Sequence, residues 1–570
     1  MSENYWTKMT ERKAHRRTLL KAGGASALGA AGLALVGCGD DSTSNSKTPS
    51  GTQPAGTQAT GTQAGSASQA AGTPKSGGTV KAGFSISVLG IDPHIETSIG
   101  LIDACHIYST LIKYNPNTNE VKGVLSETME QPSKSEFVFH LRPEAKFQNI
   151  APVNGRPVVA ADVVYSFERF RDLPQATRNG FYKTQVDKME AIDDHTFKLT
   201  TKTPYVETFG VLGIGDGFGP PSQIVAKEDV EKRGDLSNGG VGSGPYILDH
   251  YAKGEITALK RNPDYWEKGL PYPDGWNTQT ITDNQTLLQA FKSGQIDING
   301  AILTKQDRED LQADKKFVTT RVPSLSNGCF EMGAADQKPF NDPRVRQAIK
   351  IGMDRTQFIN KIFFGEATAA GAFSSGLSFW ALSQDELKKW TTHDPQKAKQ
   401  LLAAAGYPDG FDLEIDSASV QGYQDYAEIV VAELKKLGIN AKQALTDIGT
   451  FVAEHMYVGK FPSAVWATNG YPTLVTPLNY YHENGLGNGN WWHYKNDQAT
   501  AAIDKQFQEF DADARKSQVQ DIQRMVLDDW APHMPLVDGV GYSSYSTRLG
   551  GYDPSLRSYQ YLQHTEYLKS

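Results

Sequence analysis

At 570 residues, the chain is too long to fold around a single hydrophobic core, so we expect two or more lobes. Charged residues make up 21% of the chain and hydrophobic residues 39%, which is typical of a globular protein. The net charge is −8, and it becomes −12 without residues 1–37, which hold six basic and two acidic side chains. This acidic balance excludes a general nucleic-acid binder, because such proteins need a basic surface for phosphates.

The N-terminus has the features of a bacterial export signal. RRTLLK at residues 16–21 matches the twin-arginine pattern, and that export route carries proteins that are already folded. The uncharged stretch 22–36 is too short and too weakly apolar for a transmembrane helix. LVGC at residues 35–38 is similar to a lipobox, so we expect a signal peptide over 1–37 and a lipid on Cys38 that anchors the chain to the membrane surface. The alternative is a generic signal peptide with an incidental cysteine.

A linker is predicted between Cys38 and the folded body, over residues 38–77. From Ser42 it consists mainly of Ser, Thr, Gly, Gln, Ala and Pro, with the triplet GTQ repeated every five residues from Gly51. Without larger apolar side chains, burial cannot offset the entropy of ordering, so we expect disorder. About 40 such residues would reach roughly 35 Å and hold the body away from the membrane.

The first part of the body alternates strand and helix patterns. A strand is predicted over 79–88, and a helix over 102–111. Phe137, Phe139 and Leu141 alternate with polar residues, which indicates a half-buried strand. After a turn at Asn154-Gly155, apolar residues at helical spacing predict a helix from Ala160 to Phe170.

Helix signals dominate the second half of the chain. Asp342 and Pro343 suit the cap and first position of a helix whose Val345, Ala348, Ile349 and Met353 face a core. Further helices are predicted over 287–294, 394–405 and 429–438, followed by a strand over 439–445. Residues 503–530 predict one long helical segment, closed by prolines at 532 and 535.

Several motifs along the body resemble those of the family 5 extracellular solute-binding proteins, the peptide- and nickel-type receptors of ABC importers. They occur in the order of that family and cover about residues 78–570. The motifs are FVFHLRPEAKF from Phe137, AADVVYSFERF from Ala160, GSGPY from Gly242, RNPDYW from Arg261, FNDPRVRQAI from Phe340 and DPQKAKQLL from Asp394. A phosphate-binding loop at residues 239–244 is excluded, because no lysine follows at the required spacing.

The resemblance implies an α/β fold with two lobes of the periplasmic-binding-protein kind, type II, and an extra subdomain on the first lobe. We place the first lobe at 78–325 and 537–570, and the second at 326–536. In such receptors a solute binds between the lobes, which close over it by a hinge motion. The resemblance also implies that the chain is an exported, monomeric, non-enzymatic protein on the periplasmic or cell-surface side, with ABC permease subunits as partners and no cofactor.

Ligand-binding residues are predicted from the same resemblance and from clustered aromatic side chains, whose flat rings suit sugars and apolar side chains. For any one aromatic residue, core packing is the alternative. The predicted set is Ser87, Val88, Leu89, Trp380, His455, Trp466, Ala467, Asn469, Tyr471, Trp491 and Trp492.

The stretch around Trp466 departs from the peptide-binding members of the family. Asn469 stands where those members have an aspartate that pairs with the ammonium of a peptide, and an amide cannot supply that charge. His455 and Ser463 stand where relatives often have arginines for the ligand carboxylate. We therefore expect a neutral or differently charged solute, such as an oligosaccharide or a modified peptide.

Catalytic and metal-binding motifs such as HExxH, CxxC and GxSxG do not occur in the sequence. Cys105 and Cys329 are predicted to be buried thiols, with a disulfide between them as the alternative. His455, His482 and His493 could meet as metal ligands, but structural roles for them are favoured, and no metal site is predicted.

Two other functions stay open at this stage. One is a lipid-anchored secreted hydrolase acting on sugars or peptides, which would need a nucleophile or a pair of converging carboxylates. The acidic pairs Asp193-Asp194 and Asp528-Asp529 are expected to be turn and surface residues instead. The other function is a receptor that feeds a sensory system. The sequence does not name the solute or the permease.

Overall fold

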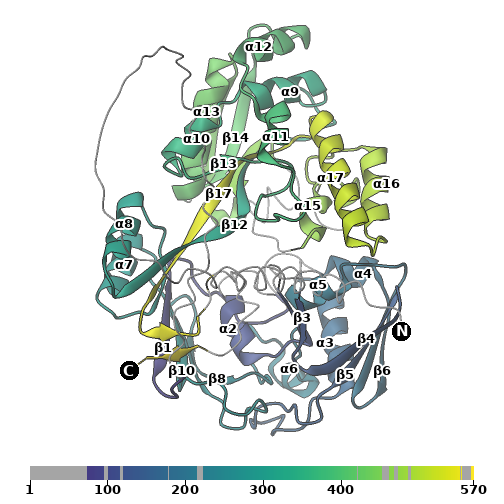
Figure 1. The fold of residues 1–570 in the computed structure, drawn as a ribbon, viewed down its shortest axis with the longest axis vertical. Coiled ribbons are helices and arrows are strands. Elements are labelled where there is room, and N and C mark those ends of the chain that lie inside the picture. The colour runs from purple at the N-terminus through teal and green to yellow at the C-terminus, as the bar shows by residue number, and fades with distance from the viewer. Residues whose placement is uncertain are drawn as a thin grey trace, which may run out of the picture.

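The computed structural model describes residues 74–95, 100–115, 120–176, 179–214, 222–419, 421–451, 461–467, 473–485, 490–552, 554 and 566–569. The predicted signal peptide, Cys38 and nearly all of the predicted linker lie outside these residues. Two lobes stand one above the other in Figure 1, with the N-terminal elements below.

One large sheet runs through both lobes, in the order β15-β14-β16-β12-β17-β11-β1-β10-β9-β8, with β13 beside β17. Its two long strands, β12 and β17, pair antiparallel from Phe317↔Ser546 to Glu331↔His533. β17 pairs with β11 of the first lobe at one end and with β13 of the second lobe at the other. The strands of this sheet are β1 (Thr79–Phe84), β8 (Tyr246–Ala252), β9 (Ile256–Arg261), β10 (Gly275–Thr280), β11 (Ile298–Gly300), β12 (Phe317–Glu331), β13 (Thr368–Ala369), β14 (Asp412–Ala418), β15 (Asn440–Thr446), β16 (Ala464–Ala467) and β17 (His533–Ser546).

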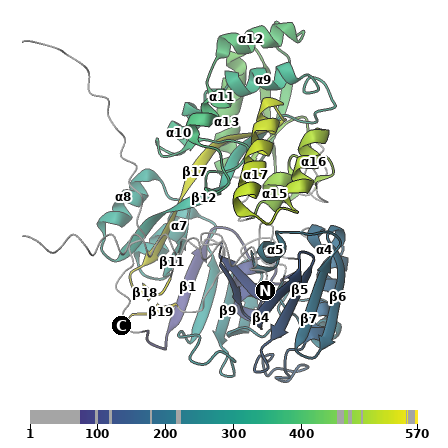
Figure 2. The ribbon, with the colours of Figure 1, turned by 45° about the vertical axis from the view of Figure 1, so that its right-hand side comes forward.

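β12 and β17 therefore connect the lobes as two continuous strands (Figures 1 and 2). The predicted lobe boundaries, 325/326 and 536/537, fall within these strands. The boundaries themselves stay a prediction.

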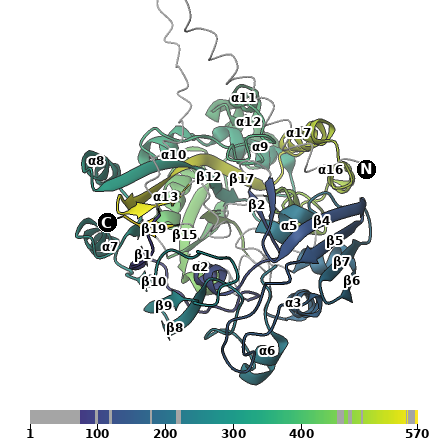
Figure 3. The same cartoon turned by 60° about the horizontal axis from the view of Figure 1, so that its bottom comes forward.

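The first lobe carries a separate sheet, β4-β5-β7-β6, which lies beside the β1-β10-β9-β8 part of the large sheet (Figure 3). The alternation over Phe137–Leu141 is confirmed, since Phe137, Phe139 and Leu141 are all buried in β5. Phe137 and Phe139 meet Phe209 of α5 edge-to-face at 5.3 and 6.1 Å, and on the neighbouring strand β7 Phe197 meets Phe167 of α3 edge-to-face at 5.5 Å. These elements are β4 (Ser126–Ser133), β5 (Glu136–Leu141), β6 (Val186–Asp193), β7 (Thr196–Thr201), α3 (Ala160–Asp172), α4 (Gly180–Thr184) and α5 (Thr208–Ile214).

The GSGPY and RNPDYW motifs contact each other through hydrogen bonds in the first lobe. Gly242 lies so close to α2 (Gly100–Ile107) that a Cβ atom would meet the Ile107 carbonyl oxygen at 1.9 Å. Asn262 donates from its side chain to the Gly244 carbonyl, and Trp266 donates from its indole to the Ser243 carbonyl. The glycines thus serve close backbone packing.

Two helices of the second lobe begin where the sequence predicts, whereas the helix predicted over 429–438 begins earlier, at Gln421, and ends at Lys436. Asp342 caps α9 (Pro343–Gly352) by accepting from the Arg344 N–H, and Asp394 caps α12 (Pro395–Ala404). The predicted core positions of α9 are fully buried.

The other elements of the two lobes are β2 (Ile112–Asn115), β3 (Glu120–Gly123), β18 (Leu549–Gly550), β19 (Tyr567–Leu568), α6 (Lys227–Arg233), α7 (Asn284–Lys292), α8 (Lys305–Ala313), α10 (Thr356–Lys361), α11 (Gln384–Thr391), α13 (Gln421–Lys436), α14 (Ile448–Thr450) and α15 (Val475–Asn479).

The prediction of one helical segment over 503–530 is wrong. The chain forms two helices, α16 (Asp497–Gln506) and α17 (Ala512–Asp528). The break arises because Asp511 caps α17, accepting from the N–H groups of Asp513 and Ala514. The predicted strand 79–88 also ends early, at Phe84, and the predicted helix 102–111 ends at Ile107.

Candidate functional site

The two lobes also meet away from the connecting strands, where α16 and α17 lie above α4 and α5 (Figures 1 and 2). Tyr205 of the first lobe stacks on Phe507 of the second with 4.9 Å between ring centroids. The Val206 N–H donates to the Phe507 carbonyl at 2.8 Å. The helix break between α16 and α17 exposes this carbonyl to the other lobe. We call residues 205–207, Phe507 and Arg515 the interlobe contact.

A buried ion pair between Glu207 and Arg515 completes the interlobe contact. The Arg515 side chain is fully buried, and that of Glu207 is 5% exposed. Arg515 also donates to Gln506 at 2.9 Å, and its guanidinium lies over the ring of Trp380 at 5.0 Å. Trp380, a predicted ligand-binding residue, therefore covers the interlobe ion pair on the side of the second lobe.

Three other predicted residues belong to one aromatic group in the second lobe. Trp466 meets Trp491 edge-to-face at 5.6 Å, and Trp491 meets Trp492 at 5.9 Å. Trp491 is half-buried, whereas Trp492 is fully buried and donates from its indole to the Tyr480 carbonyl. In this arrangement Trp492 serves the core, and Trp491 is the member with a solvent-accessible ring.

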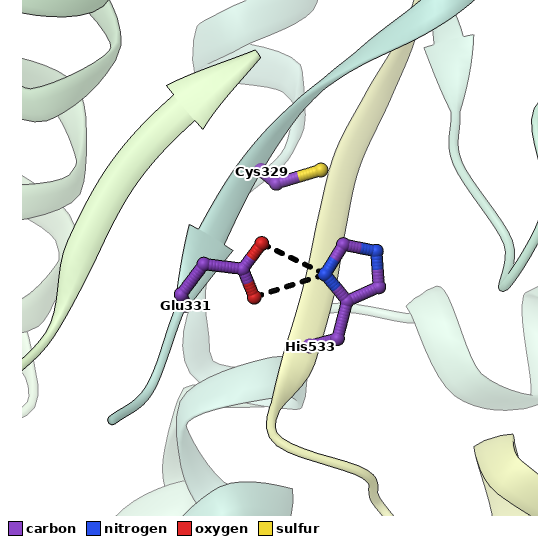
Figure 4. A group of neighbouring side chains, drawn as sticks. All are labelled: Cys329, Glu331 and His533. Atoms are coloured by element: carbon purple, nitrogen blue, oxygen red, sulfur yellow. Dashed lines mark hydrogen bonds and ion pairs between the residues drawn. The ribbon is translucent and has the colours of Figure 1, made fainter. Parts of the chain in front are cut away.

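Trp466 is held by a polar group behind it. Its indole N–H donates to Glu331 at 2.6 Å, and Nδ1 of His533 lies 2.8 and 2.9 Å from the two Glu331 oxygens. Cys329 lies beside this pair on the same face of β12 (Figure 4). The sequence analysis missed this group, because Glu331 and His533 are 202 residues apart and carry no local motif.

Ser87, Val88 and Leu89 follow the end of β1. Val88 is buried in the first lobe, and its carbonyl accepts from the Gly254 N–H at 2.9 Å. Leu89 and the neighbouring Ile86 are each 59% exposed. Leu89 and Ile86 are thus the apolar side chains of this turn that are open to solvent.

The remaining predicted site residues are only partly described. Ala467 ends β16, opposite Gly328 of β12. His455, Asn469 and Tyr471 lie outside the described residues. Ser463 is buried and donates to the Glu414 carbonyl at 2.6 Å, so its hydroxyl serves the second lobe internally.

Histidines that the sequence raised as possible metal ligands have separate partners. His482 pairs with Asp504 and His493 with Asp336. Cys105 and Cys329 are both buried thiols that form no disulfide, which confirms that prediction.

The acidic pairs have local roles. Asp193 accepts from the His195 N–H in the turn between β6 and β7. Asp528 accepts from the Trp390 indole, and Asp529 accepts from the Tyr494 hydroxyl. In the part of the chain that the structure describes, no helix is long and apolar enough to cross a membrane.

Comparison with known proteins identifies the family. The pattern described as "Bacterial extracellular solute-binding proteins, family 5 Middle" matches residues 120–490. The chain belongs to this family, as its sequence motifs predict.

Curated relatives include the glutathione-binding protein GsiB of Salmonella typhi, which is 29% identical over 352 residues. That match covers 61% of this chain and 65% of the relative, so the chain matches less than two thirds of the relative's length.

Solved structures confirm the two-lobed α/β fold. The binding protein AgaA from A. tumefacien R10, in complex with agropinic acid, is 26% identical with a TM-score of 0.75 and covers 86% of this chain and 99% of its own. The binding protein DppA from Helicobacter pylori, in complex with the peptide STSA, is 23% identical with a TM-score of 0.76 and covers 87% and 99%.

Proposed function

We propose that this chain is the substrate-binding lipoprotein of an ABC importer, which captures a solute between its lobes and delivers it to a membrane permease. Membership of the family 5 solute-binding proteins carries this proposal. Two observations support it. Among the described residues, the lobes share two continuous strands, β12 and β17, which suits hinge motion, and they also meet through the interlobe contact.

The solute is a peptide, an oligosaccharide or a related compound. Relatives carry names or titles with glutathione, agropinic acid and the peptide STSA, so solutes vary among relatives of this fold. Asn469 in place of an aspartate favours a solute without a free peptide ammonium. Trp491 and Leu89, which are solvent-accessible, are the predicted residues best placed to contact it.

Export and anchoring follow from the N-terminal sequence. The twin-arginine signal leads to cleavage before Cys38, the lipid on Cys38 holds the protein on the outer side of the membrane, and the linker lets the body reach the permease. The protein acts as a monomer and not as an enzyme.

A thermal-shift screen of the unlipidated mature chain against peptides, oligosaccharides and metal chelates tests this function. A solute that binds the folded state raises the melting temperature according to RT ln(1 + [L]/Kd). We expect a shift with one class of compound and, by mass spectrometry, no turnover of that compound. A shift accompanied by turnover of the compound would contradict the receptor function and support the alternative, a secreted hydrolase.

Replacing Asn469 with aspartate is expected to increase the affinity for free peptides. The new carboxylate would form a charge-assisted bond with the peptide ammonium, which is about twice as strong as a neutral hydrogen bond. Isothermal titration with a short peptide and with its N-acetylated form measures the effect. The gain should appear only for the free peptide, and equal affinities for both forms would show that Asn469 does not face the ligand ammonium.

A further inference from the structure

Cys329, Glu331 and His533 are placed together by the pairing of β12 with β17. Cys329 and Glu331 are two positions apart on β12, so their side chains point to the same face of the sheet. His533 lies directly opposite Glu331 in the antiparallel ladder. All three side chains therefore converge on one point from two rigid, adjacent strands (Figure 4).

The group is compact and enclosed. One donor atom from each residue, namely the Cys329 sulfur, a Glu331 oxygen and a His533 ring nitrogen, lies within 4.8 Å of the other two. The exposed fractions of the three residues are 0%, 0% and 2%. Trp492 stacks on the His533 ring at 5.0 Å and 14°, and Tyr480 lies 4.8 Å from it, so aromatic rings wall off one side.

The donor types select among metals. A sulfur, an imidazole nitrogen and a carboxylate oxygen form the set that Zn²⁺ accepts, whereas Mg²⁺ and Ca²⁺ require oxygen ligands. A thiolate and a carboxylate together carry two negative charges, which a divalent cation neutralises inside the apolar surroundings. Zinc bonds of about 2.0–2.3 Å would need only small rotations of side chains already grouped this closely.

The residues next to Cys329, Glu331 and His533 are arranged like the outer shell of a metal site, which orients the ligands. The Trp466 indole donates to Glu331 at 2.6 Å, and such a bond to a ligating carboxylate fixes its orientation. Lys350 donates to the His533 carbonyl at 3.0 Å and holds the start of β17. The Trp466 bond would persist when the metal replaces the direct contact between Glu331 and His533.

We propose that Cys329, Glu331 and His533 bind a zinc ion that ties β12 to β17 at the second-lobe end of the two connecting strands and, through Glu331, fixes Trp466. A buried site of this kind is filled as the chain folds, and the predicted twin-arginine route exports chains that are already folded. Three protein ligands leave one tetrahedral position for a water molecule. This site is independent of which solute the lobes capture.

Metal analysis of the full chain, expressed with zinc and purified without chelator, tests the site. We expect one zinc ion per chain by mass spectrometry. After removal of zinc, Co²⁺ should give tetrahedral absorption bands and a thiolate-to-cobalt charge-transfer band in the near ultraviolet. Cys105→Ala is the matched control, because it removes the other buried thiol, in the first lobe, and should keep both signals.

The variants Cys329→Ser and His533→Gln identify the ligands. Cys329→Ser keeps the size of the side chain and should lose the charge-transfer band, and His533→Gln should lower the zinc content at least tenfold. Wild-type protein without zinc and without the cobalt bands would overturn the proposal whether or not the variants fold. A charge-transfer band that survives in Cys329→Ser, or that disappears in Cys105→Ala, would also overturn it.

Discussion

Replacing Arg515 with methionine is expected to shift the protein toward an open arrangement of its lobes. The variant leaves the Glu207 carboxylate buried and unpaired in the interlobe contact, and breaking a buried pair in this way costs about 3–5 kcal/mol. The unpaired carboxylate regains water when the lobes separate. Small-angle X-ray scattering should show a larger radius of gyration, and the affinity for a captured solute should fall by up to roughly 100-fold to 4,000-fold.

Arg524→Met is the matched control for this prediction. Arg524 lies on the same helix, α17, but its pair with Glu386 is within the second lobe, with both side chains more than a third exposed. An exposed pair contributes little, so the radius of gyration and affinity should stay at the wild-type values. The same radius of gyration in Arg515→Met and in wild type would show that the ion pair does not hold the lobes together.

Replacing Asp103 with asparagine is expected to remove a large pH dependence of stability. Burial raises the pKa of Asp103 from 3.8 to about 7, although the Thr278 hydroxyl donates to the carboxylate at 2.6 Å. Between these values the folded state holds a proton that the unfolded chain has released, so the contribution of Asp103 to stability is fully present below about pH 4 and is lost as the pH rises to 7. The loss is on the order of 4 kcal/mol.

Urea unfolding at several pH values between 4 and 8 measures this effect. Asp103→Asn should match wild type near pH 4 and be more stable than wild type at pH 7.5, because an amide stays neutral. Asp385→Asn provides a control of opposite sign, since the Lys388 hydrogen bond lowers the pKa of this exposed carboxyl. If wild type and Asp103→Asn show the same pH dependence, Asp103 is ionised in the folded protein at neutral pH.

Much of the secondary structure could be predicted from local sequence patterns. The alternation of Phe137, Phe139 and Leu141, and the caps Asp342 and Asp394, depend on neighbours within a few residues, so the sequence displays them directly. The order of the family motifs then supplied the two-lobed architecture, which periodicity alone does not reach.

Long-range pairing accounts for what the sequence did not reveal. The contact of Glu207 with Arg515 spans 308 residues, and that of Glu331 with His533 spans 202. The break between α16 and α17 depends on the Asp511 cap, which interrupts an otherwise continuous helical pattern. The burial of Trp492 could not be predicted from the sequence either, because clusters of aromatic residues occur both in hydrophobic cores and on binding surfaces.

The two connecting strands also govern how the chain can fold during synthesis. β17, at His533–Ser546, lies between β11 of the first lobe and β12 in the large sheet, so neither lobe has its full sheet until residues 533–546 have left the ribosome. The first lobe must wait for residues made more than 200 positions after its own last helix, α8. Loss of β17 would therefore leave the sheets of both lobes incomplete at once, because the two lobes share this one segment of the chain.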